Sequence, residues 1–200
     1  MVHREEALAL LDRHCPADSS WRAHCLQVSN AGYLLAERIS QRGHAVDVEQ
    51  AAVLGLLHDL GRSRGHDLRH GVEGYLLARA AGHEEEGRIC LIHILKGRTL
   101  AQGVKLGMLI PEERLQLEES GSLSGDLSLE EKIVIVADAL MSDTGLVSIE
   151  EKYANSRRRY GALPHHYQDE AWVKALAGEI AQLLGEDPHQ VLQETKNDML

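Results

Sequence analysis

Residues 51–61 read Ala-Ala-Val-Leu-Gly-Leu-Leu-His-Asp-Leu-Gly, an apolar run with His58 and Asp59 side by side near its end. Neighbouring side chains on a helix point about 100° apart, so a helix this apolar must also accommodate the carboxylate of Asp59. An unpaired ionised carboxylate in such a place is costly, so it should be paired, neutralised or bound to a cation. A metal ion held jointly by His58 and Asp59 meets this requirement and predicts further ligands elsewhere in the chain.

The composition predicts one all-α domain over residues 1–200. The chain is 44% hydrophobic, contains no Phe and is rich in Leu, Ala, Glu and Arg, which is typical of helices packed by aliphatic side chains. Two hundred residues are enough to bury a sizeable core. We see no internal repeat and no linker that marks a second domain.

Charge and cysteine usage limit the partners and the compartment. The net charge of −10 argues against nucleic acid as a partner, although a local basic pocket for a small anion is compatible with it. The three scattered cysteines, Cys15, Cys25 and Cys90, indicate reduced thiols. No apolar run is long enough to cross a membrane, and the N-terminus lacks a signal-peptide pattern. We therefore expect a cytoplasmic protein that does not associate with membranes.

Periodicity and capping signals predict a succession of helices. Asp18 or Ser19 is expected to cap the second helix, and Gly61 to end the third. Residues 132–141 have strand propensity, but the capping pair Ser128 and Glu131 and the lack of other convincing strands favour a helix. Residues 97–128 are predicted to form short helices and a mobile loop. The expected helices cover residues 2–14, 20–41, 47–61, 68–81, 84–95, 128–141, 148–160 and 169–184, with a short last one from 187.

Four further polar residues stand where apolar ones are expected or at the starts of helices. Asp138 and His93 lie inside apolar runs, whereas His24 and His70 each begin a helix. Together with His58 and Asp59 they provide imidazole and carboxylate groups, the mixed ligand set that suits divalent first-row metals. Three of them also have an ordinary explanation: a lone core histidine such as His93 is usually only hydrogen-bonded, an Arg partner would satisfy Asp138, and His70 could simply start its helix.

The order of these residues resembles the HD superfamily of metal-dependent phosphohydrolases over about residues 20–145. The resemblance rests on His24 in Arg-Ala-His-Cys-Leu-Gln-Val, on His58-Asp59 in Leu-Leu-His-Asp-Leu-Gly-Arg and on Asp138 in Val-Ala-Asp-Ala-Leu. It implies a compact HD-domain helical bundle, followed here by a C-terminal helical extension over about 148–198. The chain looks most similar to small HD-domain proteins related to the HD-type dinucleoside tetraphosphate hydrolases. The Gly-Tyr-Pro signature of cyclic-dinucleotide phosphodiesterases is absent.

The resemblance also implies a ligand set. It assigns a first metal to His24, His58, Asp59 and Asp138, and a second to His70 and His93 with Asp59 bridging. The expected cofactor is one or two divalent ions, from among Fe, Mn, Co, Ni and Zn. A competing zinc site, made of the His14-Cys15 and His24-Cys25 pairs, matches no common spacing.

Basic residues near these positions are the candidates for substrate contacts. Asp59 and Arg62 are the expected catalytic residues. Asp59 could orient a metal-bound hydroxide, and the guanidinium of Arg62 could hold a phosphate with two hydrogen bonds. Alternatively, these basic residues are simply exposed to solvent in a loop or on a helix face and have no role in binding. His165 and His166 are expected to be exposed in a Pro-containing loop. The candidate substrate-binding residues are Arg62, Arg64, His66, Arg69 and Lys96.

The sequence thus predicts a phosphohydrolase that cleaves a nucleotide or similar small phosphorylated substrate with a metal-activated water. A non-catalytic HD module that binds nucleotide or metal for regulation is the alternative, and a plain helical scaffold is a third interpretation. The oligomeric state is left open.

Overall fold

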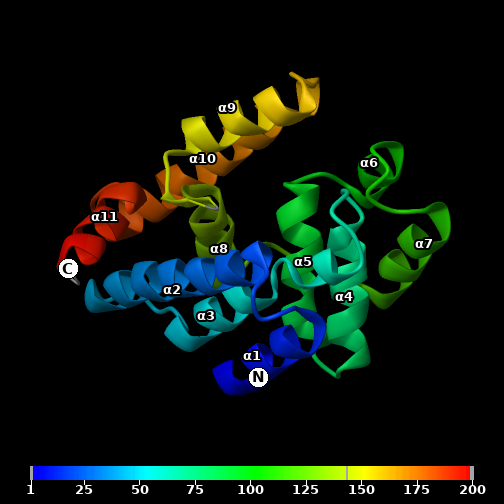
Figure 1. Cartoon of the computed structure of the whole chain (residues 1–200), viewed down its shortest axis with the longest axis horizontal. Helices are drawn as coiled ribbons and strands as arrows, with labels where there is room; N and C mark the ends of the chain where they lie inside the picture. The colour runs from blue at the N-terminus through cyan, green and yellow to red at the C-terminus, as the bar shows by residue number, and fades with distance from the viewer. Residues whose placement is uncertain (1, 143, 199–200) are drawn as a thin grey trace.

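The computed structural model describes residues 2–142 and 144–198, and the side chains of its last helix through Glu194 (Figure 1). These residues form a helical protein with one short two-stranded hairpin, which confirms the all-α prediction. The N-terminal helices are α1 (Arg4–His14), α2 (Ser20–Gln41) and α3 (Val48–Leu57), followed by the 3-10 turn η1 (Leu60–Ser63). The middle of the chain forms α4 (His70–Ala80), α5 (Glu84–Leu95), α6 (Leu100–Lys105) and α7 (Pro111–Ser120). The remainder comprises α8 (Leu129–Leu140), β1 (Met141–Ser142), β2 (Gly145–Leu146), α9 (Ile149–Tyr160), α10 (Pro164–Leu184) and α11 (Pro188–Asp198).

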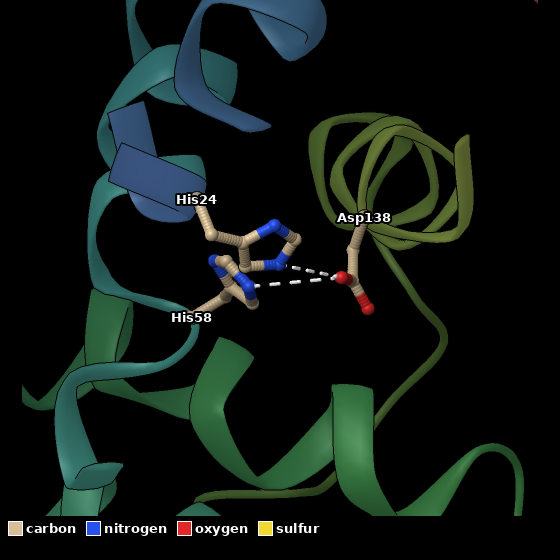
Figure 2. A group of neighbouring side chains, drawn as sticks. All are labelled: His24, His58 and Asp138. Atoms are coloured by element: carbon tan, nitrogen blue, oxygen red, sulfur yellow. Dashed lines mark hydrogen bonds and ion pairs between the residues drawn. The ribbon is translucent and has the colours of Figure 1, made fainter. Parts of the chain in front are cut away.

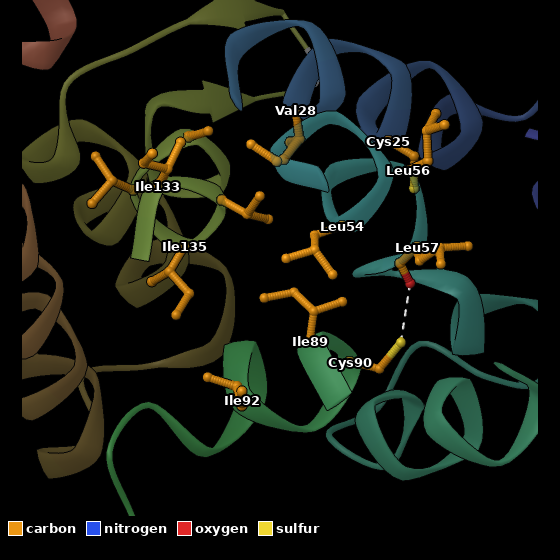
Figure 3. Packing of buried hydrophobic residues seen from close by; sticks show 14 of the residues in the cluster. Cys25, Val28, Leu54, Leu56, Leu57, Ile89, Cys90, Ile92, Ile133 and Ile135 are labelled. Carbon is orange, nitrogen blue, oxygen red and sulfur yellow. Dashed lines mark hydrogen bonds between the residues drawn. The ribbon is translucent and has the colours of Figure 1, made fainter. Parts of the chain in front are cut away.

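Helix α3 is the central element of the core. All its residues from Ala51 to Leu57 are buried, as the apolar run predicts. It packs against α2, α8 and α5, and Figure 3 shows side chains from all four helices meeting in one cluster. Burial of so much aliphatic surface supplies most of the driving force for this arrangement.

A glycine lets α2 and α3 approach closely. A Cβ on Gly55 would lie 2.6 Å from the Cα of Ser29, so no larger residue fits between the two backbones. Ser29 Oγ also donates a hydrogen bond to the carbonyl of Ala52 at 2.8 Å. This close contact holds His24 of α2 against the end of α3, where His58 follows.

Side-chain caps fix the helix starts that the sequence predicts. Ser19, rather than Asp18, caps α2 by accepting from the amide of Arg22. At the start of α8, Ser128 and Glu131 form a reciprocal capping box, and residues 129–140 are helical as expected. The strand alternative for 132–141 is wrong except at Met141, which pairs with Leu146 in the hairpin.

Two expectations about local structure are wrong. Gly61 does not end α3, which stops at Leu57; it lies in η1, where a Cβ would be 1.9 Å from the carbonyl oxygen of His70. His165 and His166 are not in a loop, because α10 begins at Pro164, a residue that is favoured at the first helical position. His166 is therefore only 8% exposed.

The C-terminal helices lie over one face of the core. Figure 1 shows α9 and α10 side by side above α8, with α11 returning towards α2. Lys132 of α8 pairs with Glu179 of α10 at 2.7 Å, and Arg38 of α2 pairs with Glu186 at 3.3 Å. Within the described residues, no helix has both the length and the apolar character that crossing a membrane requires.

Candidate metal centre

The fold brings the four histidines and two aspartates of the sequence prediction into two adjoining groups. Each group has three potential ligand atoms that lie within 4.8 Å of one another. His58 is fully buried and Asp59 is 1% exposed. The contributing residues are His24 (α2), His58 and Asp59 (after α3), His70 (start of α4), His93 (α5) and Asp138 (α8).

The first group consists of His24, His58 and Asp138. Nε2 of His24 lies 3.0 Å from Oδ1 of Asp138, and Nε2 of His58 lies 3.9 Å from the same oxygen. Figure 2 shows both imidazoles pointing towards the carboxylate, His24 from α2 and His58 from the turn that follows α3. Three segments far apart in sequence thus direct nitrogen and oxygen atoms to one point.

The second group consists of Asp59, His70 and His93. Oδ1 of Asp59 lies 3.1 Å from Nε2 of His70 and 3.2 Å from Nε2 of His93. The two imidazole nitrogens are 3.3 Å apart. Tight contacts between α4 and η1 and between α4 and α5 place these side chains together.

Asp59 connects the two groups through its two oxygens. Oδ1 faces His70 and His93, whereas Oδ2 lies 3.6 Å from Nε2 of His58 and 4.0 Å from Nε2 of His24. One carboxylate therefore reaches both clusters, which is the geometry that a bridging ligand requires.

The hydrogen bonds of three imidazoles leave the converging nitrogens available to a cation. Nδ1 of His58 donates to the carbonyl of Gly55 at 2.8 Å, Nδ1 of His93 donates to that of Ile89 at 3.2 Å, and Nδ1 of His70 donates to that of Asp67. Because the proton is on Nδ1, each Nε2 presents a lone pair to the cluster. Nε2 of His58 is buried and has no hydrogen-bond partner among the described residues. Metal-binding histidines commonly donate their other nitrogen to a backbone carbonyl, so these residues fit a divalent ion.

The electrostatics of the cluster favour the same protonation states. Burial lowers the pKa of His58 to about 4 and also lowers that of His93, so both are neutral at pH 7. Burial alone would raise the pKa of Asp59, but the positive charge of Arg62, which donates to Oδ2, acts in the opposite direction, and the pKa lies well below its ordinary value. Asp138 behaves likewise, because Lys152 and His24 outweigh its burial and lower its pKa. Neutral imidazoles and ionised carboxylates are the forms that bind metals.

Comparison with known proteins agrees with this geometry, since a family model of the HD domain matches residues 21–143. The chain belongs to the HD family. The match contains all six residues of the two groups. An uncharacterized protein of Methanocaldococcus jannaschii is 38% identical over 160 residues, which covers 78% of this chain and 86% of that protein. No solved structure matches the chain. HD domains bind divalent metals, and the two groups could hold them.

We call the two groups together the His–Asp centre. Among the candidate substrate-binding residues, Arg62 is in direct contact with this centre. Its Nε donates to Oδ2 of Asp59, the oxygen on the side of His24 and His58. The side chain is 31% exposed, so the guanidinium lies between the buried carboxylate and solvent. This contact holds Asp59 in place, and the terminal nitrogens of the guanidinium make no hydrogen bond to the described residues.

The structure does not join Arg64, His66 or Arg69 to the centre by any hydrogen bond or ion pair among the described residues. Arg64 is exposed, with Glu73 at 3.9 Å, and His66 is exposed as well. Arg69 is engaged by Glu113 through two hydrogen bonds of 3.2 and 2.7 Å, which attach α7 to the start of α4. Their assignment to substrate binding stays a prediction.

Lys152 of α9 also contacts this centre, although no sequence pattern predicts it. Its Nζ lies 3.4 Å from Oδ1 of Asp138 and donates to the carbonyls of Asp138 and Met141. It follows a capping box by one residue and stands in a charged helix, so no local pattern distinguishes it from a surface lysine. The contact depends on how α9 packs on α8.

The zinc site considered from the sequence finds no support in the described residues. Cys15 Sγ lies 2.8 Å from Ser19 Oγ, and Nε2 of His24 faces Asp138. His14, Cys15 and Cys25 belong to neither group that could hold a metal.

Proposed function

We propose that this chain is a metal-dependent phosphohydrolase that acts on a nucleotide or another small phosphorylated substrate. The observation that carries the proposal is the position of Asp59, one carboxylate oriented towards two histidine clusters. In this assignment His24, His58 and Asp138 hold one divalent ion, His70 and His93 hold a second, and Asp59 bridges them. Bound there, the ions would supply a water of lowered pKa and would polarise a phosphoryl oxygen.

The chain's own residues provide the remaining functions. The backbone carbonyls that accept from His58, His70 and His93 fix the orientation of each ring, so the ligand atoms are held in place before binding. Arg62 keeps Asp59 oriented with its Nε, and its other nitrogens, which make no hydrogen bond to the described residues, can donate to phosphate oxygens. In a chain of net charge −10, this local cation favours a small anionic ligand at the centre.

Phosphate release tests the proposal. Protein loaded in turn with Mn²⁺, Fe²⁺, Co²⁺, Ni²⁺ or Zn²⁺ is assayed with nucleoside mono-, di- and triphosphates, dinucleoside polyphosphates and a simple aryl phosphate. We expect turnover of at least one substrate, loss of that turnover in Asp59→Ala and its retention in Asp12→Ala, which alters an exposed carboxylate paired with Arg22.

Two results would count against catalysis at this centre. Turnover that survives Asp59→Ala would place the activity elsewhere. Nucleotide binding without phosphate release from any substrate would instead support the non-catalytic regulatory module.

A further inference from the structure

Lys96 has an unusual backbone conformation directly after α5, three residues beyond His93. Its φ is +48°, and among the described residues it is the only non-glycine residue with a positive φ. Side chains other than glycine enter this left-handed region at a cost in free energy. Lys96 is the C-cap of α5, where a left-handed residue ends the helix and directs the chain towards Gly97.

The ammonium group of Lys96 has no carboxylate partner among the described residues. It is partly buried and donates one hydrogen bond, to the phenolic oxygen of Tyr153 at 3.1 Å. No carboxylate oxygen of the described residues lies within 4.0 Å of its Nζ. Asp169, on the neighbouring α10, is itself engaged by Arg98. Of the three N–H donors of Lys96, two therefore have no protein acceptor among the described residues.

Tyr153 adds a further donor beside this ammonium group. Its side chain is buried, with 6% of the residue exposed, and burial raises the pKa of its hydroxyl, which stays protonated at neutral pH. The oxygen accepts from Lys96, and no described acceptor receives the hydroxyl proton. Lys152, the preceding residue, contacts Asp138, and the charge of Asp138 acts on both Tyr153 and Lys96, so this pair lies in the neighbourhood of the His–Asp centre.

The ammonium group also keeps its charge in this setting. Burial lowers the pKa of Lys96, but the hydrogen bond to Tyr153 and the charges of Asp138 and Asp169 outweigh it and hold the pKa above its ordinary value. A protonated amine and a phenol with unused hydrogen-bonding capacity match a tetrahedral oxyanion.

We propose that Lys96 and Tyr153 form an anion subsite that binds the phosphoryl group of the substrate beside the His–Asp centre. The inference rests on the proposed function for the identity of the anion and adds a residue, Tyr153, that lies outside the matched HD segment of 21–143. It makes the C-terminal extension part of the binding site. The ammonium group also lies 5.4 Å from the centroid of the Tyr153 ring, a cation–π contact that keeps the two side chains together.

Titration with inorganic phosphate tests the subsite without depending on turnover. Calorimetry measures the dissociation constant of phosphate for the full-length protein, both without metal and after Mn²⁺ loading. The variants are Lys96→Met and Tyr153→Phe, which keep the apolar parts of the two side chains. The matched controls are Lys105→Met and Tyr160→Phe, at exposed positions in α6 and α9.

We expect Lys96→Met to weaken phosphate binding by about 10- to 100-fold and Tyr153→Phe by about 3- to 10-fold, with both controls close to the wild type. If Lys96→Met does not fold, Tyr153→Phe decides, since it removes one oxygen only. Phosphate affinity that is absent in the wild type, or unchanged in a folded variant, would overturn the subsite. Manganese binding and turnover in the same wild-type preparation report on the proposed function separately.

Discussion

Nζ of Lys152 lies 3.4 Å from Oδ1 of Asp138 and donates to the backbone carbonyl of the same residue at 2.9 Å. It also donates to the carbonyl of Met141, so one side chain satisfies two carbonyls at the C-terminal end of α8. The carbonyl of Asp138 also accepts from the amide of Met141, and a cation at the C-terminal end of a helix interacts favourably with the helix dipole. The C-terminal extension thereby stabilises the segment that carries a candidate ligand.

Replacing Lys152 by Met should lower the free energy of unfolding by about 1–3 kcal/mol, because two helix-end carbonyls lose a charged donor. Urea denaturation of the metal-free protein measures this change. Lys132→Met is the matched control, since it removes the ion pair between Lys132 of α8 and Glu179 of α10 and should cost less than about 1 kcal/mol. Equal losses in the two variants would contradict a specific role for Lys152.

Gly61→Ala should destabilise the protein by more than about 3 kcal/mol, since the new methyl group would collide with rigid backbone. Its Cβ would lie 1.9 Å from the carbonyl oxygen of His70 and 2.4 Å from the amide nitrogen of Gly74. Gly65→Ala, where the nearest atom is 3.9 Å away, should change the unfolding free energy by less than about 1 kcal/mol. A Gly61→Ala protein as stable as Gly65→Ala would show that α4 and η1 are packed less closely than described.

The metal-free protein should lose stability as the pH falls from about 6.5 to about 4. Over this range the unfolded chain protonates His58, whereas the folded protein, in which the pKa of His58 is about 4, does not. The difference corresponds to about 3 kcal/mol for this residue. Asp59 and Asp138, whose pKa values are lowered, lose their contributions only at more acidic pH.

Urea midpoints at pH 7, 5 and 4, with a chelator present, measure this dependence. His58→Gln should flatten the pH profile, and His44→Gln, at an exposed position, should leave it unchanged. A wild-type profile that is flat between pH 6.5 and 4 would contradict the burial of neutral imidazoles at the centre.

The sequence predicted the helical fold and the residues that meet at the centre, because both depend on patterns within single segments. The apolar run before His58 indicates a buried helix. The apolar run around Asp138 likewise places a charged carboxylate in a segment that is otherwise suited to burial. Capping pairs such as Ser128 and Glu131 then fixed the start of α8 as helical.

Contacts between distant segments were not predictable in this way. Lys152 contacts Asp138, and Tyr153 contacts Lys96, only because α9 packs beside α8 and the end of α5. A lysine in a charged helix carries no local signal of that packing. Glycine often ends helices, and on that ground the sequence predicts that the third helix stops at Gly61. Its position instead reflects the close approach of the His70 backbone, which only the three-dimensional structure shows.

The number of metal ions bound per chain tests the central claim most directly. Wild-type protein, Asp59→Asn and the surface control Asp12→Asn are equilibrated with Mn²⁺ or Fe²⁺, desalted and analysed by inductively coupled plasma mass spectrometry. We predict close to two ions per chain in the wild type and in Asp12→Asn, and a large loss in Asp59→Asn, because the shared carboxylate is removed from both groups. A wild-type protein that retains no ion, or an Asp59→Asn protein that retains as many as the wild type, would contradict a metal centre bridged by Asp59.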